Sequence, residues 1–149
     1  MAELSFEQEV RHTVYRLLLA TGRIPSIDDI AAEREVSRNQ IEHALETLYK
    51  SKALALMPES REILMASPWS AVPTAYVVQA GKKSWWANCA WDALAIPAAM
   101  GVEGEIESSC ACCGEAMSAR VADRRLVEGE GVVHISRPAR TWWEDIHFT

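Results

Sequence analysis

A cysteine and an aspartate lie three residues apart in the segment Asn88-Cys89-Ala90-Trp91-Asp92. Asn88 is a favourable N-cap, which predicts a helix with Cys89 at its first position and Asp92 in the next turn. Residues three apart share a helix face, so the thiol and the carboxylate should point into the same space. The free N–H groups at a helix start stabilise a thiolate, and a neighbouring carboxylate can relay a proton. The pattern predicts a reactive thiol beside a proton carrier; the plainer interpretation is an inert, buried cysteine and an aspartate satisfied near a helix start.

Cys110, Cys112 and Cys113 form a second group of thiols. Cys110 and Cys113, followed by Gly114, have the spacing of half a zinc knuckle, and a closed zinc site needs two more ligands. Alternatively, Cys112 or Cys113 lies near Cys89 and acts as a second thiol, or all three are inert. The candidate metal-binding residues, for zinc or another soft metal, are therefore Cys89, Cys110, Cys112 and Cys113.

Histidines and tryptophans accompany these thiols in the second half of the chain. Further metal ligands can come from His134, from His147 or from a second chain. His134 lies between Val133 and Ile135 in an expected strand, which favours a structural role for it. Five of the six tryptophans accompany the cysteines in the second half, which predicts a Trp-rich core, an apolar pocket that excludes water from a thiol, or both. These five are Trp85, Trp86, Trp91, Trp142 and Trp143.

Composition indicates a soluble globular protein of one domain or two small ones. The 149 residues are 49% apolar and 24% charged, with a formal net charge of −6. That charge does not favour a partner held by phosphate contacts, and no apolar run approaches the roughly 18 residues that span a bilayer. The N-terminus carries acids where a signal peptide needs a basic start. We therefore expect a cytoplasmic protein without a membrane partner and without a disulfide framework.

Residues 1–65 predict a winged-helix-like helical domain. Apolar residues recur at helical spacing after Phe6, and Gly22 is the expected stop of that helix. Ser26 with Asp29 predicts the start of a second helix, and a further one is expected from residue 37, where Ser37 is followed by Gln40. Short strands at 54–57 and 63–65 complete the pattern, and residues 66–149 form the second predicted domain.

A winged helix raises the question of DNA binding. Arg38 and Asn39, at the start of the would-be recognition helix, could read bases. The rest of that helix is close to neutral, and Arg61 in the wing is flanked by Glu59 and Glu62. The pattern therefore favours a structural or protein-contacting unit over nucleic-acid binding, although DNA stays an alternative.

The second half predicts a small mixed or antiparallel sheet with the Cys89 helix packed on it, so the fold class is α+β. Two prolines make residues 66–74 a junction, and Pro97 is expected to end or kink the Cys89 helix after about two turns. Residues 81–83 are expected to form a turn. Strands are expected at 75–79, 104–109, 116–121 and 132–136.

Three segments of the chain resemble the organomercurial (alkylmercury) lyases. They are ILMASPWSAVPT at residues 63–74, WANCAWDALAIP at residues 86–97 and IESSCACCG at residues 106–114. That family also has a winged-helix-like region ahead of its core, so the resemblance covers most of the chain. It implies a mechanism without a metal cofactor, in which two thiols capture mercury and an aspartate protonates the carbon. The matching positions make Cys89 the first mercury-binding thiol and Asp92 the proton carrier, with a structural part for Cys110.

The resemblance leaves the second catalytic thiol open. In the family this cysteine is expected just beyond the segment that residues 142–149 resemble, which is where the printed sequence stops. A shortened homologue and a missing C-terminal part are both consistent with this. The predicted functions are a carbon–mercury lyase, a non-catalytic binder of a soft metal or organomercurial, and a metal- or thiol-responsive regulator. The expected partners are a small organometal or soft-metal ligand and small thiols; the sequence does not indicate an oligomeric state.

Overall fold

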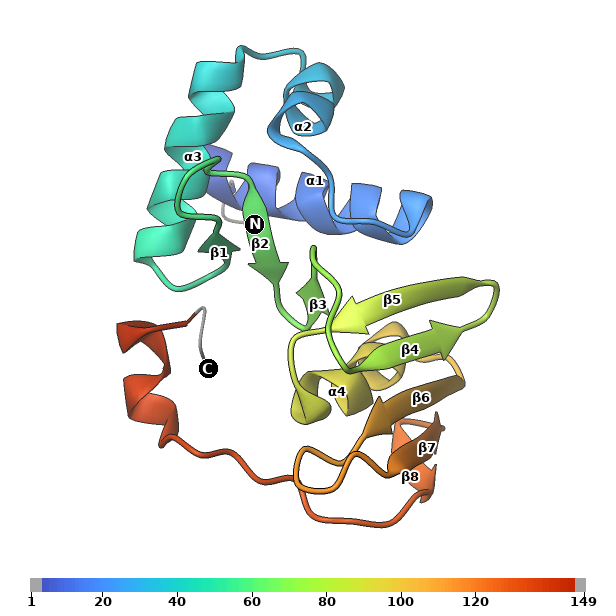
Figure 1. Ribbon diagram of the computed structural model, residues 1–149. Helices are drawn as coiled ribbons and strands as arrows, with labels where there is room; N and C mark the ends of the chain where they lie inside the picture. Colours follow the sequence, from blue (N-terminus) through green and yellow to red (C-terminus); the bar gives the residue numbers. More distant parts are fainter. Residues whose placement is uncertain (1–3, 147–149) are drawn as a thin grey trace.

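The N-terminal part of the protein is a unit of three helices followed by a hairpin. The structure is a computed structural model that describes residues 4–146, and Figure 1 shows this unit at one end of the molecule. Its elements are α1 (Phe6–Thr21), α2 (Ile27–Arg34), α3 (Arg38–Lys50), β1 (Ala55–Leu56) and β2 (Ile63–Ala66). The helices and strands expected in this region are therefore present, with ends shifted by a few residues.

Each of these three helices begins with a serine capping box. The serine side chain accepts a hydrogen bond from a backbone N–H three residues on, and the side chain at that position bonds back to the serine N–H. The pairs are Ser5 with Gln8, Ser26 with Asp29, and Ser37 with Gln40. The Ser26 backbone N–H, with Arg23, lowers the pKa of Asp29 to about 2. Gly22 ends α1 in the left-handed conformation, as predicted.

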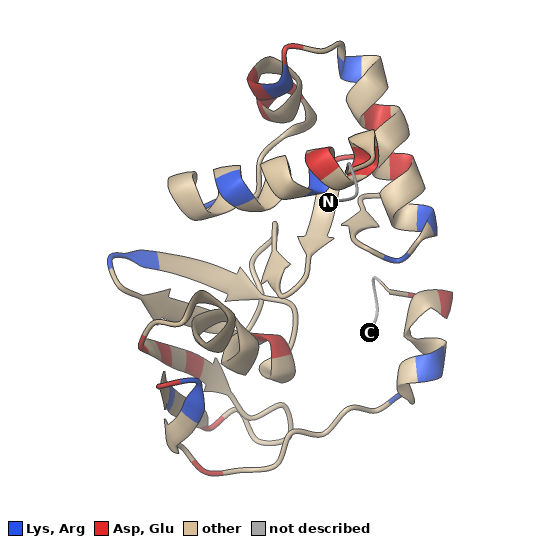
Figure 2. Cartoon of the chain, turned by 180° about the vertical axis from the view of Figure 1, so that it is seen from behind, with Lys and Arg blue, Asp and Glu red and all other residues tan. Residues whose placement is uncertain are grey.

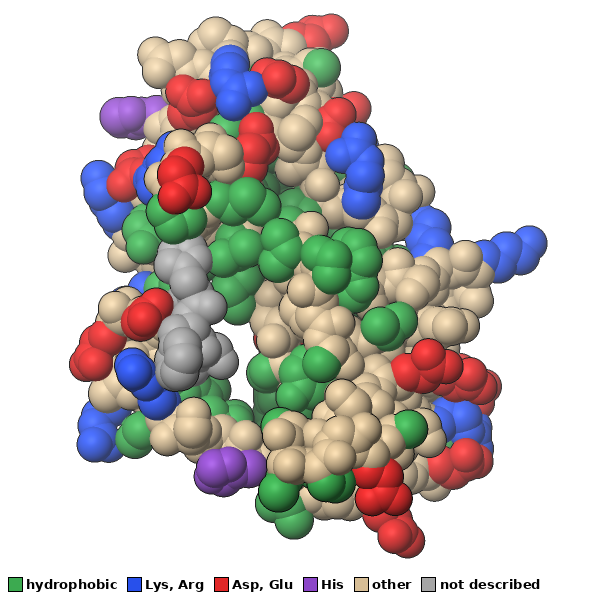
Figure 3. Space-filling model, viewed as in Figure 1, with side chains coloured by type: hydrophobic (Ala, Val, Ile, Leu, Met, Phe, Trp, Pro, Cys, Tyr) green, Lys and Arg blue, Asp and Glu red, His purple; other side chains and the backbone are tan. Residues whose placement is uncertain are grey.

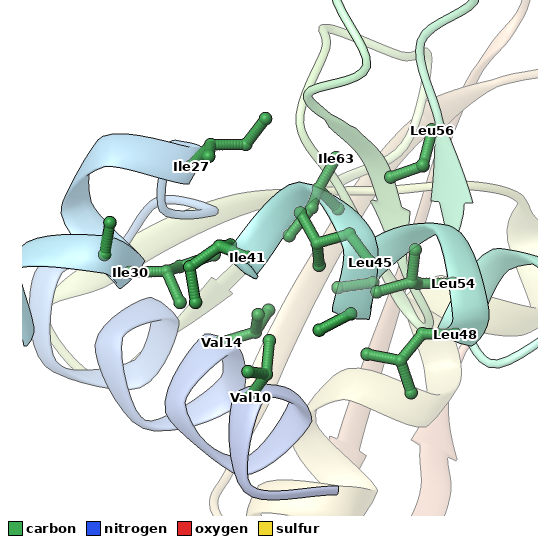
Figure 4. Packing of buried hydrophobic residues seen from close by; sticks show 13 residues of the cluster. Val10, Val14, Ile27, Ile30, Ile41, Leu45, Leu48, Leu54, Leu56 and Ile63 are labelled. Atoms are coloured by element: carbon green, nitrogen blue, oxygen red, sulfur yellow. The ribbon is translucent and has the colours of Figure 1, made fainter. Parts of the chain in front are cut away.

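Apolar side chains from all three helices and the hairpin form the core of this unit. Figure 4 shows Val14, Ile41 and Leu45 directed toward one another between α1 and α3. All three are fully buried, and strands β1 and β2 close the same cluster through Leu56 and Ile63. Burial of such side chains is the main stabilising contribution of the unit.

The remaining strands extend the hairpin into a larger sheet. They are β3 (Trp69–Ser70), β4 (Val77–Ala80), β5 (Lys83–Ala87), β6 (Gly104–Ser109), β7 (Ala116–Ala122) and β8 (Arg125–Glu128). In the described part of the chain, eight strands pair antiparallel in the order β1-β2-β3-β5-β4-β6-β7-β8. The junction predicted at residues 66–74 therefore contains β3, which links the hairpin to the rest of the sheet.

Helix α4 (Ala90–Met100) carries the predicted thiol–acid pair and covers one face of β4, β5 and β6 (Figure 1). Its buried side chains are Ala93, Ile96 and Pro97, and the first two pack in a second core with residues of these strands. Of the two predictions for Pro97, an end or a kink, the end was wrong, because α4 continues to Met100 and stops at Gly101. Pro97 instead packs on β6: a Cβ added to Gly104 would lie 2.7 Å from the Pro97 Cβ.

The part of the chain after residue 80 differs most from the predicted strands. β5 was not predicted, since only a turn at 81–83 was expected in this region. β8 was missed because all four of its residues are exposed. The strand predicted at 132–136 was wrong: the segment follows two glycines with positive φ and is irregular. His134 is therefore exposed and outside any strand. The 3-10 helix η1 (Ala139–Glu144) follows. The ring centroid of its Trp143 lies 6.4 Å from that of Tyr49 in α3.

Charged residues of both signs alternate on the helical unit (Figure 2). Arg38, at the start of α3, forms ion pairs with Asp28, Glu42 and Glu62. A guanidinium held by three carboxylates of its own chain is poorly placed to read bases. The fold is α+β, as predicted; the winged-helix likeness and the boundary after residue 65 stay predictions. Among residues 4–146, no helix is both long and apolar enough to cross a membrane.

The contact between α4 and β6 gives a stability prediction. Gly104→Ala places a methyl group against Pro97 and 3.2 Å from the Gln79 carbonyl oxygen, so α4 must move away from the sheet. We expect a loss of about 1–3 kcal/mol in the free energy of unfolding, measured by urea denaturation. Glu105→Ala, on the exposed neighbour in the same strand, is the control and should change stability by less than about 0.5 kcal/mol. Equal effects of the two substitutions would contradict this account of the packing.

Candidate active site

Residues far away in the sequence fix the connection between β5 and α4. The Thr74 hydroxyl donates to the Ala87 carbonyl oxygen at 2.6 Å, and the Ala87 N–H donates to the Tyr76 carbonyl at 3.0 Å. The Asn88 N–H donates to the Pro68 carbonyl at 3.4 Å. The segment predicted only as a junction therefore holds the chain immediately before the thiol. Sequence reasoning missed this role, since Thr74 and Pro68 lie more than ten residues earlier.

Cys89 itself is the N-cap of α4, so the prediction of Asn88 as the cap was wrong by one residue. Cys89 has an extended backbone, with φ −151° and ψ 178°, and Ala90 is the first helical residue. The Cys89 carbonyl accepts the first helical hydrogen bond, from the Ala93 N–H at 2.9 Å. Its thiol makes no capping hydrogen bond of normal geometry. The side chain nevertheless lies in the field of the free N–H groups at the helix start.

The thiol of Cys89 and the carboxylate of Asp92 interact directly, as their spacing predicted. Burial is the largest effect on both and raises the pKa of each group above its ordinary value. The Trp91 and Asp92 N–H groups lower the pKa of Cys89, but they do not outweigh its burial. The hydrogen bond between the two side chains raises the pKa of Cys89 and lowers that of Asp92. The sequence suggested a stabilised thiolate at this position. Cys89 is instead a half-buried thiol that donates its proton toward the Asp92 carboxylate, whose proton affinity is increased.

Asn88 is the second partner of Asp92. Its Nδ2 donates to Asp92 Oδ2 at 3.1 Å, which partly offsets the effect of burial and lowers the pKa of Asp92. Among the described residues, the buried Oδ1 of Asn88 has no hydrogen-bond partner. The amide therefore holds the carboxylate from one side and lowers its proton affinity against the larger effect of burial. Sequence reasoning assigned Asn88 to the helix cap and missed this contact.

The tryptophans divide between core and surface. Trp69 and Trp85 are buried in the second core, as a Trp-rich core requires. Trp91, two residues after the thiol, is 64% exposed, and Trp86 is 39% exposed. Figure 3 shows hydrophobic side chains gathered on the face where the helical unit meets the sheet. The indole of Trp91 thus stands at the surface of α4 beside the thiol–acid pair.

The other three cysteines lie in the turn between β6 and β7. The turn closes through the Gly114 N–H to the Cys110 carbonyl and the Cys110 N–H to the Glu115 carbonyl, both at 2.8 Å. The Cys113 and Cys112 N–H groups point to the Cys110 sulfur, and the Cys113 thiol hydrogen-bonds to it. These contacts lower the pKa of Cys110, with the Cys113 N–H the largest cause. Cys112 and Cys113 are exposed free thiols.

The structure thus groups the predicted site residues as two pairs, Cys89 with Asp92 and Cys110 with Cys113. Among residues 4–146, no three His, Cys, Asp or Glu side chains are placed to hold a metal ion together. The tetrahedral ligand set that structural zinc needs is therefore not assembled from the described residues. His147, one of its candidate ligands, lies outside them.

A cavity of about 370 Å³ lies between α4 and the cysteine turn, and Cys110 is the one member of the two pairs among its lining residues. Ala90 and Leu94 of α4 line one side of it, and Cys110 and Cys112 of the turn line another. Its wall also includes Met117 of β7, while the segment 129–134 brings His134 to it. The cavity is largely apolar, and Ala90 places the first turn of α4 at its edge.

A family model described as alkylmercury lyase matches residues 69–149 of this chain. The matched part includes α4, the cysteine turn and the cavity between them. The chain belongs to the alkylmercury lyase family. The three segments that resemble this family in the sequence therefore reflect membership.

A solved structure shares the fold. The crystal structure of the mercury-bound form of MerB2 is similar, with a TM-score of 0.64 and 18% sequence identity. The match covers 82% of this chain and 60% of that chain, so this chain spans less than two thirds of its length. No curated protein matches this chain.

The burial of Cys89 leads to a prediction about its reactivity. Iodoacetamide labelling, followed for each cysteine by peptide mass spectrometry, should give Cys89 an apparent pKa above its ordinary 9.0. Asp92→Asn should lower that pKa, because the carboxylate charge and its hydrogen bond with the thiol both raise it. Asp123→Asn, in an exposed turn that tolerates asparagine, is the matched control and should leave it unchanged. A Cys89 pKa below 9.0 would show that the helix start, and not burial, dominates.

The Asn88 contact leads to a separate prediction. Asn88→Ala removes a hydrogen bond to the Asp92 carboxylate that lowers its pKa, so the pKa of Asp92 should rise further above its ordinary 3.8. Carboxyl ¹³C NMR of aspartate-labelled protein measures this, with the Asp92 signal assigned from Asp92→Asn. Asn39→Ala, exposed on α3, is the control. An unchanged or lower Asp92 pKa in Asn88→Ala would rule out this positioning role.

Proposed function

We propose that this protein cleaves the carbon–mercury bond of an organomercurial by protonolysis, with Cys89 as the mercury-binding thiol and Asp92 as the proton carrier. The observation that carries the proposal is the direct contact of these two side chains at the start of α4, within a member of the alkylmercury lyase family. Thiolate sulfur is the ligand that soft metals prefer, and a carboxylate of raised pKa is suited to proton transfer.

The raised pKa values favour a definite order of proton transfers. As the Cys89 sulfur bonds to mercury and displaces the thiolate bound there, the thiol proton passes to the Asp92 carboxylate. Asp92 then gives this proton to the carbon, which leaves as a hydrocarbon with the electron pair of the carbon–mercury bond. Mercury(II) stays on Cys89, and a small thiolate occupies its second position. A further small thiol removes the mercury as a dithiolate and returns a proton to Cys89.

The small thiol has a defined part in this scheme, because the site pairs one thiol with one carboxylate. An organomercurial in a cell carries a small thiolate as its second ligand, and this thiolate can rebind after the carbon leaves. The cytoplasm, our proposed location, supplies such thiols and keeps Cys89 reduced.

The helical unit has a supporting part in the proposal. The Tyr15 hydroxyl of α1 donates to the Ser67 carbonyl at 2.9 Å, and its ring lies 5.8 Å from that of Trp69. This contact holds the segment whose Pro68 carbonyl accepts the Asn88 N–H. We propose that the winged-helix-like unit braces the site. The ion pairs of Arg38 weigh against the alternative of a DNA-binding regulator.

The alternative function is a binder that holds an organomercurial or soft metal without cleaving it. Binding of mercury needs a thiol but no proton donor, so Asp92 in contact with Cys89 favours the enzyme.

The decisive experiment is hydrocarbon release. The protein, incubated with phenylmercury and excess small thiol, should release benzene, and in D₂O the benzene should carry one deuterium. Cys89→Ser should abolish release, and Asp92→Asn should reduce it about 100-fold or more, as loss of a positioned proton donor does. Asp123→Asn is the matched control with unchanged activity.

Two outcomes would contradict the proposal. Tight phenylmercury binding without benzene release would identify a binder. Release that persists in Cys89→Ser or Asp92→Asn would place the chemistry elsewhere.

A further inference from the structure

We propose that Cys110 and Cys113 form a two-thiolate site that accepts mercury(II) from Cys89 across the neighbouring cavity. The transfer part of this inference rests on the proposed function, whereas the binding part does not. Its basis is the geometry of the turn between β6 and β7 and the position of that turn beside α4.

The turn holds its two thiols together before any metal binds. Two backbone hydrogen bonds of 2.8 Å join Cys110 to Gly114 and Glu115 across the turn. Gly114 adopts φ +74°, a left-handed conformation that glycine takes without strain, and this lets the chain reverse directly after Cys113. The Cys113 side chain and the backbone N–H groups of Cys112 and Cys113 lie close to the Cys110 sulfur. A dithiol arranged in this way binds a metal without the ordering cost of two separate thiols.

The number of ligands favours mercury(II) over zinc. Structural zinc takes four ligands, and among the described residues no third side chain joins this pair. Mercury(II) binds two thiolates in a nearly linear arrangement and needs no more. Because Cys113 is exposed and Cys110 is only half-buried, their side chains can turn to take the metal between them.

The position of the turn suits transfer from the thiol of α4. Cys110 and Cys112 line the cavity of about 370 Å³, and Ala90, which follows Cys89, lines it too. Leu94 and Met117 contribute apolar side chains to its lining. A dithiol at a high effective concentration competes well with single thiols from solution.

The transfer step balances without another reactant. Cys110 and Cys113, as thiols, replace Cys89 and the small thiolate on mercury. Two sulfur–mercury bonds form and two break. One thiol proton passes to the Cys89 sulfur and the other to the small thiolate, which leaves as a thiol, and no oxidation state changes. Cys89 is then a free thiol again, ready for another organomercurial.

Binding can be tested without the lyase chemistry. Cys89→Ser protein is mixed with mercuric chloride and excess glutathione, passed through a desalting column, and its mercury content measured. We expect one mercury per chain, with the ultraviolet absorption of mercury–thiolate bonds. A further Cys110→Ser or Cys113→Ser substitution should reduce the retained mercury at least 10-fold. Cys112→Ser, an exposed thiol in the same turn, is the matched control and should retain one mercury.

Several binding results would overturn the site. They are equal loss in Cys112→Ser, full retention in Cys110→Ser and Cys113→Ser, and stable retention of one zinc per chain. Circular dichroism of each variant shows whether it keeps its fold, and the exposed Cys113 provides a test if Cys110→Ser does not fold.

Transfer is tested in a single turnover. Wild-type protein receives one equivalent of the phenylmercury–glutathione complex without further thiol, and the thiols left unblocked are mapped by alkylation and mass spectrometry. After benzene release, Cys89 should be free and Cys110 and Cys113 protected. Protected Cys89 with free Cys110 and Cys113 would overturn the transfer while leaving the lyase proposal intact. Absence of benzene, with mercuric ion still bound by Cys89→Ser, would overturn the lyase proposal alone.

Discussion

The site depends on the partial burial of a thiol and a carboxylate in contact with each other. Removing these groups from water favours their neutral forms, so Cys89 keeps its proton and Asp92 gains proton affinity. Such burial needs a rigid connection between β5 and α4. Thr74 and Pro68 fix the end of β5, Tyr15 fixes the segment before them, and α4 is seated on β6. The helical unit and the sheet thus both hold the segment that carries Cys89 and Asp92.

The cysteines are divided between two chemical environments. Cys89 lies beside a carboxylate and is half-buried, so its pKa is raised. Cys110 lies in a tight turn whose N–H groups stabilise negative charge on sulfur, so its pKa is lowered. In the mechanism that we propose, the Cys89 thiol supplies the proton that carbon–mercury cleavage consumes, and the Cys110–Cys113 dithiol binds the metal that cleavage leaves. The cavity lined by Cys110 and by Ala90, the neighbour of Cys89, connects the two proposed steps.

Local signals in the sequence predicted the elements that local interactions create. The serine capping boxes define the starts of α2 and α3, and Gly22 the end of α1, because these contacts span three or four residues. Strand β6 was predicted with its observed limits from the alternation of apolar and polar residues at 104–109. β8 escaped prediction because it is an exposed edge strand stabilised by pairing with β7. Residues 132–136 were wrongly predicted, since an apolar run alone does not supply a partner strand.

The sequence by itself determined that Cys89 and Asp92 lie together at the start of a helix, and it carried the resemblance to the alkylmercury lyases. A residue at a helix start and one three positions later lie close together because the first helical turn brings the chain back beside its start. Only the tertiary structure decided the protonation of that pair, the contact of Asn88 with Asp92 and the continuation of α4 through Pro97. Each of these depends on burial or on partners distant in the sequence: the sheet beneath α4, the segment 68–74 and the close approach of Gly104. The desolvation that raises both pKa values arises only when those parts are assembled around the two side chains.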